Sequence, residues 1–268
     1  LGNGRAMEPL FAARVPAWQR AFEHWDVAAS PDRDEPEWWA GAPSVTRDDS
    51  GAFWMAARMR TADAPLGLRG YEIRIYRSED GVHFAPVHSI RREDVPIAGF
   101  ERPALVRLPE SGRFHLYGCG PLDGHWCVIR FDDAERPDGF VPSSARPVIR
   151  ARPPTDPRGP AAPSAYKDPV VLWAEGMWHC FVIGILGLEQ TFHFVSEDGE
   201  TWQPVGPLGR SVLPLGGWHN YAVRPASVLP VGAGYLFVYE GSSTDWPDPS
   251  YNIATGLGYT PNLHTVVD

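Results

Sequence analysis

The sequence has almost no lysine, few cysteines and no long apolar run. Lys167 is the only lysine, so arginine supplies nearly all of the 24 basic residues, which face 33 acidic ones for a net charge of −9. Because binding to phosphate groups needs a cationic face, this charge argues against nucleic acid or an anionic membrane surface as a partner. No apolar run reaches the roughly 18 residues of a membrane-spanning helix.

The three cysteines, Cys119, Cys127 and Cys180, are odd in number and lack the spacing of metal ligands. We therefore expect three buried free thiols, no metal site and a reducing compartment. No signal-peptide pattern opens the sequence, so a cytoplasmic location is expected. Nucleotide-binding glycine motifs, the zinc-protease motif and the hydrolase serine elbow are also missing, and no cofactor is predicted.

Glycine and proline are abundant, with 27 and 28 residues, and they divide the chain into short pieces. Between them lie alternating or β-rich runs of five to eight residues, bounded by turn signals. Such runs predict an all-β protein. They cover Phe53–Met59, Tyr71–Arg77, Phe114–Tyr117, Trp126–Phe131, Val170–Trp173, Trp178–Ile183, Thr191–Val195 and Tyr235–Tyr239.

The strands follow a repeat that begins with a proline. Pro43, Pro103, Pro169 and Pro225 are spaced about 60 residues apart, and each opens a short apolar strand. An aromatic residue follows each proline about ten positions later, in the order Phe53, Phe114, Trp178 and Tyr235.

A second signature relates the first and third repeats. The segment Ser78–Phe84 reads SEDGVHF, and the segment Ser196–Trp202 reads SEDGETW. Asp-Gly between two strands is a strong signal for a tight hairpin. The aromatic residue that ends each segment can pack between neighbouring repeats.

A period of about 60 residues with four strands is typical of a β-propeller blade. We predict a five-bladed β-propeller over residues 41–268, preceded by an N-terminal segment, residues 1–40. Four blades are visible in the sequence. The fifth is absent, is completed by the N-terminal segment, or lies outside the given sequence. The alternative is a β-sandwich in which the proline spacing arises by chance.

In a propeller the first residues of the inner strands converge on one mouth of the central channel. Charged residues are costly to bury there, so their presence needs a reason. The inner-strand starts carry Glu101, Arg102, Lys167, Asp168 and Arg224, and the ends of the second strands add Arg58, Arg60 and Glu240.

Two carboxyl groups that face one channel are the groups that most enzymes use to cleave a glycosidic bond. One carboxyl group gives a proton to the leaving oxygen, and the other stays charged to activate water or attack. We predict catalytic roles for Glu101, Asp168 and Glu240, with Glu101 as proton donor and Asp168 as the charged group. The alternative is that Glu101–Arg102 and Lys167–Asp168 are ion pairs that join blades.

Several residues near the inner strands are candidates for substrate contact. Trp218 lies in a loop, and its indole can stack on a sugar, although most of the 11 tryptophans are expected to pack between blades. The triplet His219-Asn220-Tyr221 can hold substrate hydroxyls, bind a structural ion or cap a strand. Arg58, Arg102, Lys167 and Arg224 complete the predicted substrate-binding set.

These segments resemble the five-bladed β-propeller glycoside hydrolases of the family 43, 32 and 130 type. The resemblance lies in Ala42–Val45, Phe100–Pro103, Tyr166–Pro169, the two SEDG segments and Tyr239–Ser242, and it covers residues 38–268 as a pattern. It implies hydrolysis or phosphorolysis of glycosidic bonds by carboxylates at the starts of the inner strands.

Two positions depart from these families. Families 43 and 32 carry an Asp before the first-blade proline, where this chain has Ala42. Family 130 carries a Glu-Asp-Pro-Arg motif, where this chain has Arg102 in place of the Asp. The main prediction is a glycosidase for a small oligosaccharide or glycoside. The alternatives are a non-catalytic carbohydrate-binding propeller and a phosphorylase whose Arg58, Arg102 and Arg224 bind phosphate.

Overall fold

The computed structural model describes residues 20, 23–151, 161–207 and 209–267. Within them the chain forms antiparallel sheets joined by short turns, which confirms the all-β prediction. Of the predicted N-terminal segment, residues 1–40, the structure describes residues 20 and 23–40, and the first strand begins within it at Trp39. No helix in the described part has the length and apolar character needed to cross a membrane.

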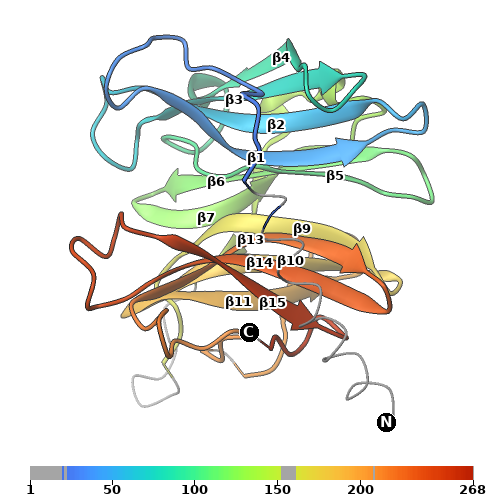
Figure 1. Cartoon of the computed structure of the whole chain (residues 1–268). Coiled ribbons are helices and arrows are strands. Elements are labelled where there is room, and N and C mark those ends of the chain that lie inside the picture. Colours follow the sequence, from blue (N-terminus) through green and yellow to red (C-terminus); the bar gives the residue numbers. More distant parts are fainter. Residues whose placement is uncertain (1–19, 21–22, 152–160, 208, 268) are drawn as a thin grey trace.

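The first two repeats each form a four-stranded antiparallel meander (Figure 1). In the first meander the strands are β1 (Trp39–Arg47), β2 (Phe53–Arg60), β3 (Gly70–Ser78) and β4 (Ala85–Arg91). The second contains β5 (Ala104–Arg107), β6 (Phe114–Leu122), β7 (His125–Arg130) and β8 (Arg146–Arg150). Single turns of 3-10 helix accompany them: η1 (Arg92–Asp94), η2 (Pro137–Gly139) and η3 (Pro142–Ser144).

The third and fourth repeats are joined into one seven-stranded sheet. The third contains β9 (Tyr166–Ala174), β10 (Met177–Leu186), β11 (Leu188–Ser196) and the short β12 (Gln203–Pro204). The fourth contains β13 (Ala222–Val231), β14 (Gly234–Ser242) and β15 (Ala254–Thr260), and Val267 bridges Tyr259 at its outer edge. A single parallel pairing, Glu189 with Ala222, links the two repeats.

The repeat inferred from proline spacing matches these meanders. Pro43, Pro169 and Pro225 lie within β1, β9 and β13, and Pro103 directly precedes β5. The predicted strand segments all fall on observed strands, except that β7 ends one residue before Phe131. Successive first strands contact one another, β1 with β5, β5 with β9 and β9 with β13. The closure into five blades stays a prediction.

Among the described residues the core has three apolar layers, each between two consecutive repeats, and a smaller fourth cluster in which Met55, Ala57 and Tyr76 of the first repeat pack with Ala28, Ala29 and Phe84. Because neighbouring strand residues point to opposite faces, one strand serves two layers. On β6, Phe114 and Leu116 pack against the first repeat, whereas Tyr117 and Cys119 pack against the third. On β10, Trp178 faces the second repeat and Phe181 faces the fourth. The sheets are thus stacked in chain order, as Figure 1 shows from β1–β4 to β9–β15.

The two SEDG segments form the same hydrogen-bonded turn. In each, the serine hydroxyl accepts the glycine N–H at 2.9 Å. The aspartate then accepts the next two backbone N–H groups, at 2.9 and 2.8 Å for Asp80 and at 2.8 and 2.7 Å for Asp198. Gly81 and Gly199 have φ of 78° and 72°, which glycine adopts without strain.

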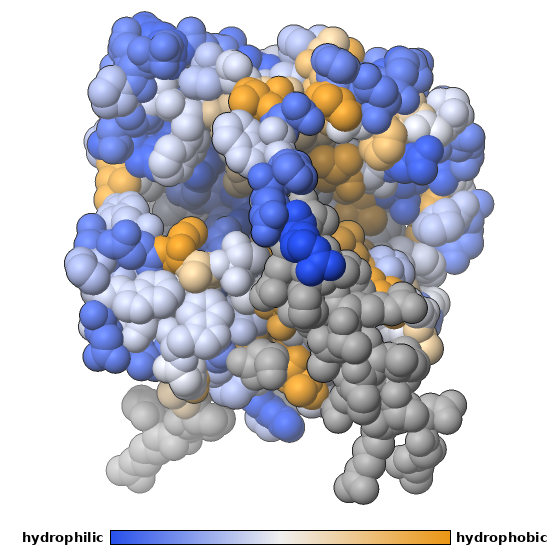
Figure 2. Space-filling view, viewed as in Figure 1, coloured by the Kyte–Doolittle hydropathy of each residue, from blue (hydrophilic) through white to orange (hydrophobic). Residues whose placement is uncertain are grey.

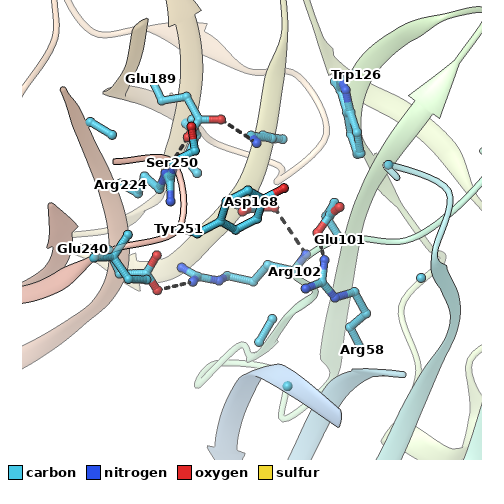
Figure 3. A pocket seen from close by; sticks show the side chains of 18 of the residues that line it. Arg58, Glu101, Arg102, Trp126, Asp168, Glu189, Arg224, Glu240, Ser250 and Tyr251 are labelled. Atoms are coloured by element: carbon cyan, nitrogen blue, oxygen red, sulfur yellow. Dashed lines mark hydrogen bonds and ion pairs between the residues drawn. The ribbon is translucent and has the colours of Figure 1, made fainter. Parts of the chain in front are cut away.

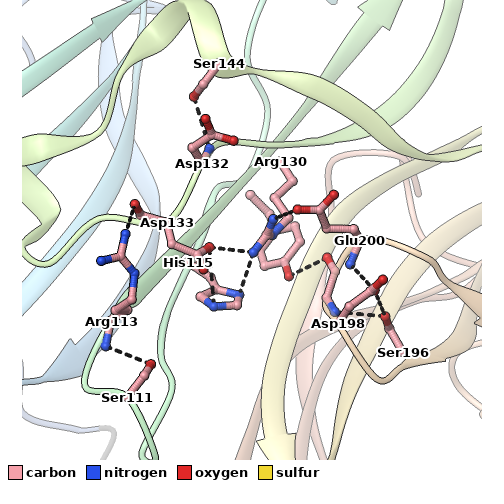
Figure 4. Close-up of polar contacts among 12 residues, drawn as sticks. Ser111, Arg113, His115, Arg130, Asp132, Asp133, Ser144, Ser196, Asp198 and Glu200 are labelled. Atoms are coloured by element: carbon pink, nitrogen blue, oxygen red, sulfur yellow. Dashed lines mark hydrogen bonds and ion pairs between the residues drawn. The ribbon is translucent and has the colours of Figure 1, made fainter.

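A polar cluster joins the second and third repeats at the third-repeat turn (Figure 4). The nearly buried guanidinium of Arg130 donates to Glu200, and to Asp133 at 2.5 Å. Arg146 donates to the same Glu200. Beside it, the Tyr117 hydroxyl donates to the carbonyl of Gly199 at 2.8 Å. The turn therefore anchors the third repeat to the second.

Candidate functional site

The starts of the first strands meet at one cavity of about 970 Å³. It is lined by residues of all four repeats, and Figure 3 shows its charged side chains pointing toward a common space. The surface of Figure 2 is hollowed between the upper and lower sets of strands. Seven of the ten predicted site residues line this cavity: Arg58, Glu101, Arg102, Lys167, Asp168, Arg224 and Glu240.

Two predicted carboxylates are held by arginines from other segments. Arg58 on β2 forms an ion pair with Glu101, whose backbone N–H donates to Cys119 O on β6 at 2.9 Å. Arg102 reaches from the start of β5 across to Glu240 on β14, with 3.2 Å between Nη2 and Oε1. Arg102 also donates to the carbonyl of Pro225. These contacts join the first, second and fourth repeats around the cavity.

Asp168 lies at the centre of the cavity wall, between Arg102 and Cys119. Its Oδ1 accepts the backbone N–H of Arg102 at 3.3 Å. Burial alone would raise the pKa of Asp168, but the charges of Arg102, Lys167 and Arg58 and this hydrogen bond hold the pKa below its ordinary value. The carboxyl group of Asp168 is therefore charged.

Glu189 is a functional candidate that the sequence analysis missed. It lies at the start of β11, after the tight turn at Gly187, and its carboxylate binds Lys167 at 2.6 Å and also the Nε of Arg224. Two of the predicted cations are thus paired through one acid, not with Asp168. The sequence feature that could have indicated Glu189 is its position as a single charged residue directly after the apolar stretch 183–188.

Ala42 occupies the position where the resembled families carry an Asp. It lines the cavity and has a φ of 51°, close to the 55° of Asp168, which also precedes a proline. Neither Glu37 nor Glu72 fills its place. Glu72 is buried and binds Arg74 and Arg91, and Glu37 binds Arg60 and Arg69. Among the described residues, the first repeat gives the cavity lining no carboxylate.

Three predicted substrate-binding residues, Trp218, His219 and Asn220, are not among the residues that line the cavity. Trp218 stacks on Tyr239 and Trp246, with ring centroids 5.8 and 6.0 Å apart. His219 is buried. The Asn220 side chain accepts the backbone N–H of Thr244 at 2.8 Å, so it fixes a turn after β14. Of the predicted triplet His219-Asn220-Tyr221, only Tyr221 lines the cavity, and contact of the triplet with substrate hydroxyls stays a prediction.

Other aromatic residues stand at the cavity instead. Trp39 is 42% exposed and Tyr251 is 64% exposed, and Trp126 lines the same cavity near Lys167. Ser250, bound to Tyr221 at 3.0 Å, completes this side of the lining. Exposed rings beside charged groups can contact the C–H face of a sugar while the charged groups bind hydroxyls.

All three cysteines are buried and free, as predicted. In the described part of the chain, no cluster of three or more histidine, cysteine or acidic side chains has the arrangement of a metal site.

The fold is similar to solved structures of carbohydrate-active proteins. A glycosyl hydrolase from Bacteroides ovatus matches with a TM-score of 0.62 and 14% identity, over 90% of this chain and 76% of that one. A thermostable family-43 glycoside hydrolase matches with a TM-score of 0.60 and 12% identity, over 89% of this chain and 74% of that one. The β-1,2-mannobiose phosphorylase from Listeria innocua matches with a TM-score of 0.58 and 12% identity, over 90% of this chain and 79% of that one.

No family model matches the sequence, and no curated protein matches it either. At 12–14% identity the similarity establishes the fold. The resemblance inferred from the sequence is confirmed at that level: the chain has the fold of structures that include glycoside hydrolases, one of them of family 43.

Proposed function

We propose that the four repeats are blades of a β-propeller and that the protein is a glycosidase for a small oligosaccharide or glycoside. The observation that carries this proposal is the position of Glu101, Asp168 and Glu240. They come from three repeats and line one cavity beside exposed aromatic rings. The fold similarity to glycoside hydrolases supports the same reaction class.

The cavity suits a short substrate. Its volume of about 970 Å³ lies at the upper end of the range for sites that enclose a small ligand. Trp39 and Tyr251 are exposed there, so a sugar ring can stack while its hydroxyls meet charged groups. This favours an oligosaccharide end or a small glycoside as substrate.

The roles follow from the surroundings of each carboxyl group. Asp168 stays charged beside Arg102, Lys167 and Arg58, as a base, a nucleophile or a stabiliser of positive charge in the transition state requires. We assign proton donation to Glu101. Because Glu101 forms an ion pair with Arg58, this pair has to open and the carboxylate has to take up a proton from solvent before Glu101 can protonate the leaving oxygen. Glu240, held by Arg102, orients the substrate.

The test is hydrolysis of a panel of aryl glycosides by the wild type and by Asp168→Asn. The substitution keeps the shape and removes the charge, so turnover is expected to fall at least about a hundredfold. The melting temperature should change little. Asp138→Asn, at an exposed ion pair with Arg136, is the matched control and should keep full activity. Unchanged turnover in Asp168→Asn, with lower stability, contradicts the assignment and favours a role in joining blades.

The second candidate is a carbohydrate-binding protein without catalysis. Ala42 favours it, because the first repeat places a methyl group where the resembled families place a carboxylate. Calorimetric binding of an oligosaccharide that the protein leaves intact over days distinguishes this candidate from the glycosidase.

The phosphorylase alternative requires Arg58, Arg102 and Arg224 to bind phosphate. Each of them is paired with a carboxylate, Arg58 with Glu101, Arg102 with Glu240 and Arg224 with Glu189. A phosphate ion has to compete with these acids, which makes the three arginines a poor phosphate site. Glycoside cleavage that depends on added inorganic phosphate, with release of a sugar phosphate, is the result that favours this alternative.

A further inference from the structure

The cavity has a charge balance opposite to that of the whole chain. Basic side chains outnumber acidic ones in the lining, although acidic residues outnumber basic ones by 33 to 24 in the sequence. The basic set is Arg58, Arg60, Arg69, Arg102, Lys167 and Arg224, and the acidic set is Glu101, Asp168, Glu189 and Glu240. A cavity built only for neutral sugar hydroxyls does not need this excess of cations.

Among the residues that the structure describes, Arg60 and Arg69 are the two basic residues of the lining that have no acidic partner within the lining. The acids of the cavity lining contact the other four cations, through Arg58–Glu101, Arg102–Glu240 and the bridge of Glu189 to Lys167 and Arg224. Asp168 accepts the backbone N–H of Arg102, and the cations that act on its charge are Arg102, Lys167 and Arg58. Within the described part of the chain, the ion pairs of Arg60 and Arg69 go to Glu37, which does not line the cavity.

Arg60 and Arg69 are held in place by the protein and share a single carboxylate. The Arg60 side chain is only 10% exposed, and its guanidinium lies 4.1 Å from the centre of the Trp39 ring. Arg69 is anchored by its Nε, which donates to the carbonyl of Ala64 at 3.0 Å. Burial and the like charge of Arg69 both lower the pKa of Arg60, and Glu37 opposes this effect. The two cations are close enough to repel each other, so an anion between them is stabilising.

We propose that Arg60 and Arg69, beside Trp39, form a subsite for the carboxylate of an acidic sugar residue, and that the Glu37 side chain holds this subsite in the absence of substrate. This inference rests on the proposed function and adds the substrate class, a glycoside or oligosaccharide that contains a hexuronate. A substrate carboxylate can displace the Glu37 side chain, because this side chain is 56% exposed and belongs to a turn before β1.

A sugar carboxylate fits this subsite better than a free anion does. Guanidinium groups bind a carboxylate through paired hydrogen bonds, which adds geometric selectivity to charge attraction. The exposed part of Trp39 offers a surface for the sugar ring that carries the carboxylate. A free phosphate ion uses the two arginines and makes no use of the indole.

The experiment is isothermal titration calorimetry of the full chain with six probes. These are the methyl glycosides of galacturonate and glucuronate, the neutral methyl galactoside and methyl glucoside, a galacturonate disaccharide, and inorganic phosphate. The variants are Arg69→Gln and Glu37→Gln, with Arg136→Gln as a control at an exposed ion pair outside the cavity. Thermal melting of each variant shows that it is folded.

We expect the hexuronates to bind at least about tenfold more tightly than their neutral counterparts, as hydrogen bonds to charged groups allow. Arg69→Gln should weaken hexuronate binding more than the binding of neutral sugars, so the preference should disappear. Glu37→Gln should tighten hexuronate binding several-fold, because the competing charge is gone. Since Glu37→Gln leaves both arginines in place, it tests the proposal even if Arg69→Gln does not fold.

Equal binding of acidic and neutral sugars in the wild type overturns the proposal. Tighter binding of phosphate than of every hexuronate overturns it too, since the subsite then serves a free oxyanion. Hexuronate preference without any glycoside cleavage keeps the subsite and contradicts the glycosidase. Cleavage of neutral glycosides at equal rates by the wild type and Arg69→Gln, without hexuronate preference, supports the glycosidase and contradicts the subsite.

Discussion

The thiol of Cys119 lies against Asp168. Its Sγ accepts the backbone N–H of Asp168 at 3.0 Å and is 3.5 Å from Oδ1 of the same residue and 3.6 Å from the carbonyl of Arg102. Cys119 is buried on β6, whereas Asp168 is on β9, so one side chain of the second repeat sets the position of a carboxylate in the third.

Replacing Cys119 should therefore alter catalysis through Asp168. Cys119→Ala leaves the N–H of Asp168 without its partner, so we expect turnover to fall about tenfold with a smaller change in KM. Cys119→Ser restores a hydrogen-bonding group and should recover part of the loss. Steady-state kinetics of both variants check this. Equal turnover in Cys119→Ala and the wild type contradicts a positioning role for the thiol.

Titration of Cys119 should not affect activity in ordinary buffers. Burial, followed by the charge of Asp168, raises the pKa of the thiol well above its usual value. We expect no loss of activity with thiol-alkylating reagents at about pH 8 in the folded protein, measured against a denatured control. Rapid modification of Cys119 in the native state, detected by mass spectrometry, argues against this burial.

The acid limb of the pH profile should lie at unusually low pH. The pKa of Asp168 in the folded chain is below its ordinary value of 3.8, so the group is charged over the whole practical range. A lowered carboxyl pKa contributes stability that is present above the ordinary value and lost as the pH falls below it. The melting temperature of the wild type should therefore drop more steeply below about pH 4 than that of Asp168→Asn. Parallel melting curves contradict this.

Glu200 should stabilise the junction between the second and third repeats. Its carboxylate accepts from both Arg130 and Arg146, and Arg130 is nearly buried (Figure 4). Glu200→Gln should lower the free energy of unfolding by about 2 kcal/mol, the range for a hydrogen bond to a charged group. Glu197→Gln, in the same turn but exposed, should have little effect. Equal denaturant midpoints for the two variants contradict the prediction.

A buried histidine pair should make the fold sensitive to mild acid. His179 and His193 share a hydrogen bond of 3.0 Å, and burial, then the positive charges of His179 and His264, lower the pKa of His193 to about 3. Because the unfolded chain takes up a proton near pH 6.5, stability is complete above that pH and is lost as the pH falls toward 3. His193→Gln should flatten the dependence of melting temperature on pH between about 7 and 4. Exposed His125→Gln is the control.

The organisation of the fold was predictable because it depends on short sequence patterns that recur along the chain. A proline, then an aromatic residue about ten positions later, marks the first and second strands of every repeat. The aspartates of the two SEDG segments make identical turns, since their hydrogen bonds involve only neighbouring residues. Such signals depend on the chain itself and not on distant partners.

The candidate site was only partly predictable because its pairings depend on contacts between repeats. Glu189 has no counterpart in the other repeats, and its importance comes from meeting Lys167 and Arg224 in space. Trp218 was predicted to contact a sugar; it lies outside the cavity lining and stacks on Tyr239 of β14, so that contact stays a prediction. Composition gives no means of distinguishing that ring from Trp39, which does line the cavity.

The backbone at Ala42 bears on how this chain can evolve. A positive φ is costly for alanine, by roughly 1–2 kcal/mol, and aspartate adopts it more readily. Asp168 has the same conformation before its own proline. The first repeat thus keeps a main-chain shape suited to an acid while carrying a methyl group. Ala42→Asp should be tolerated by the fold, which leaves the chain one substitution away from the first-repeat Asp of families 43 and 32.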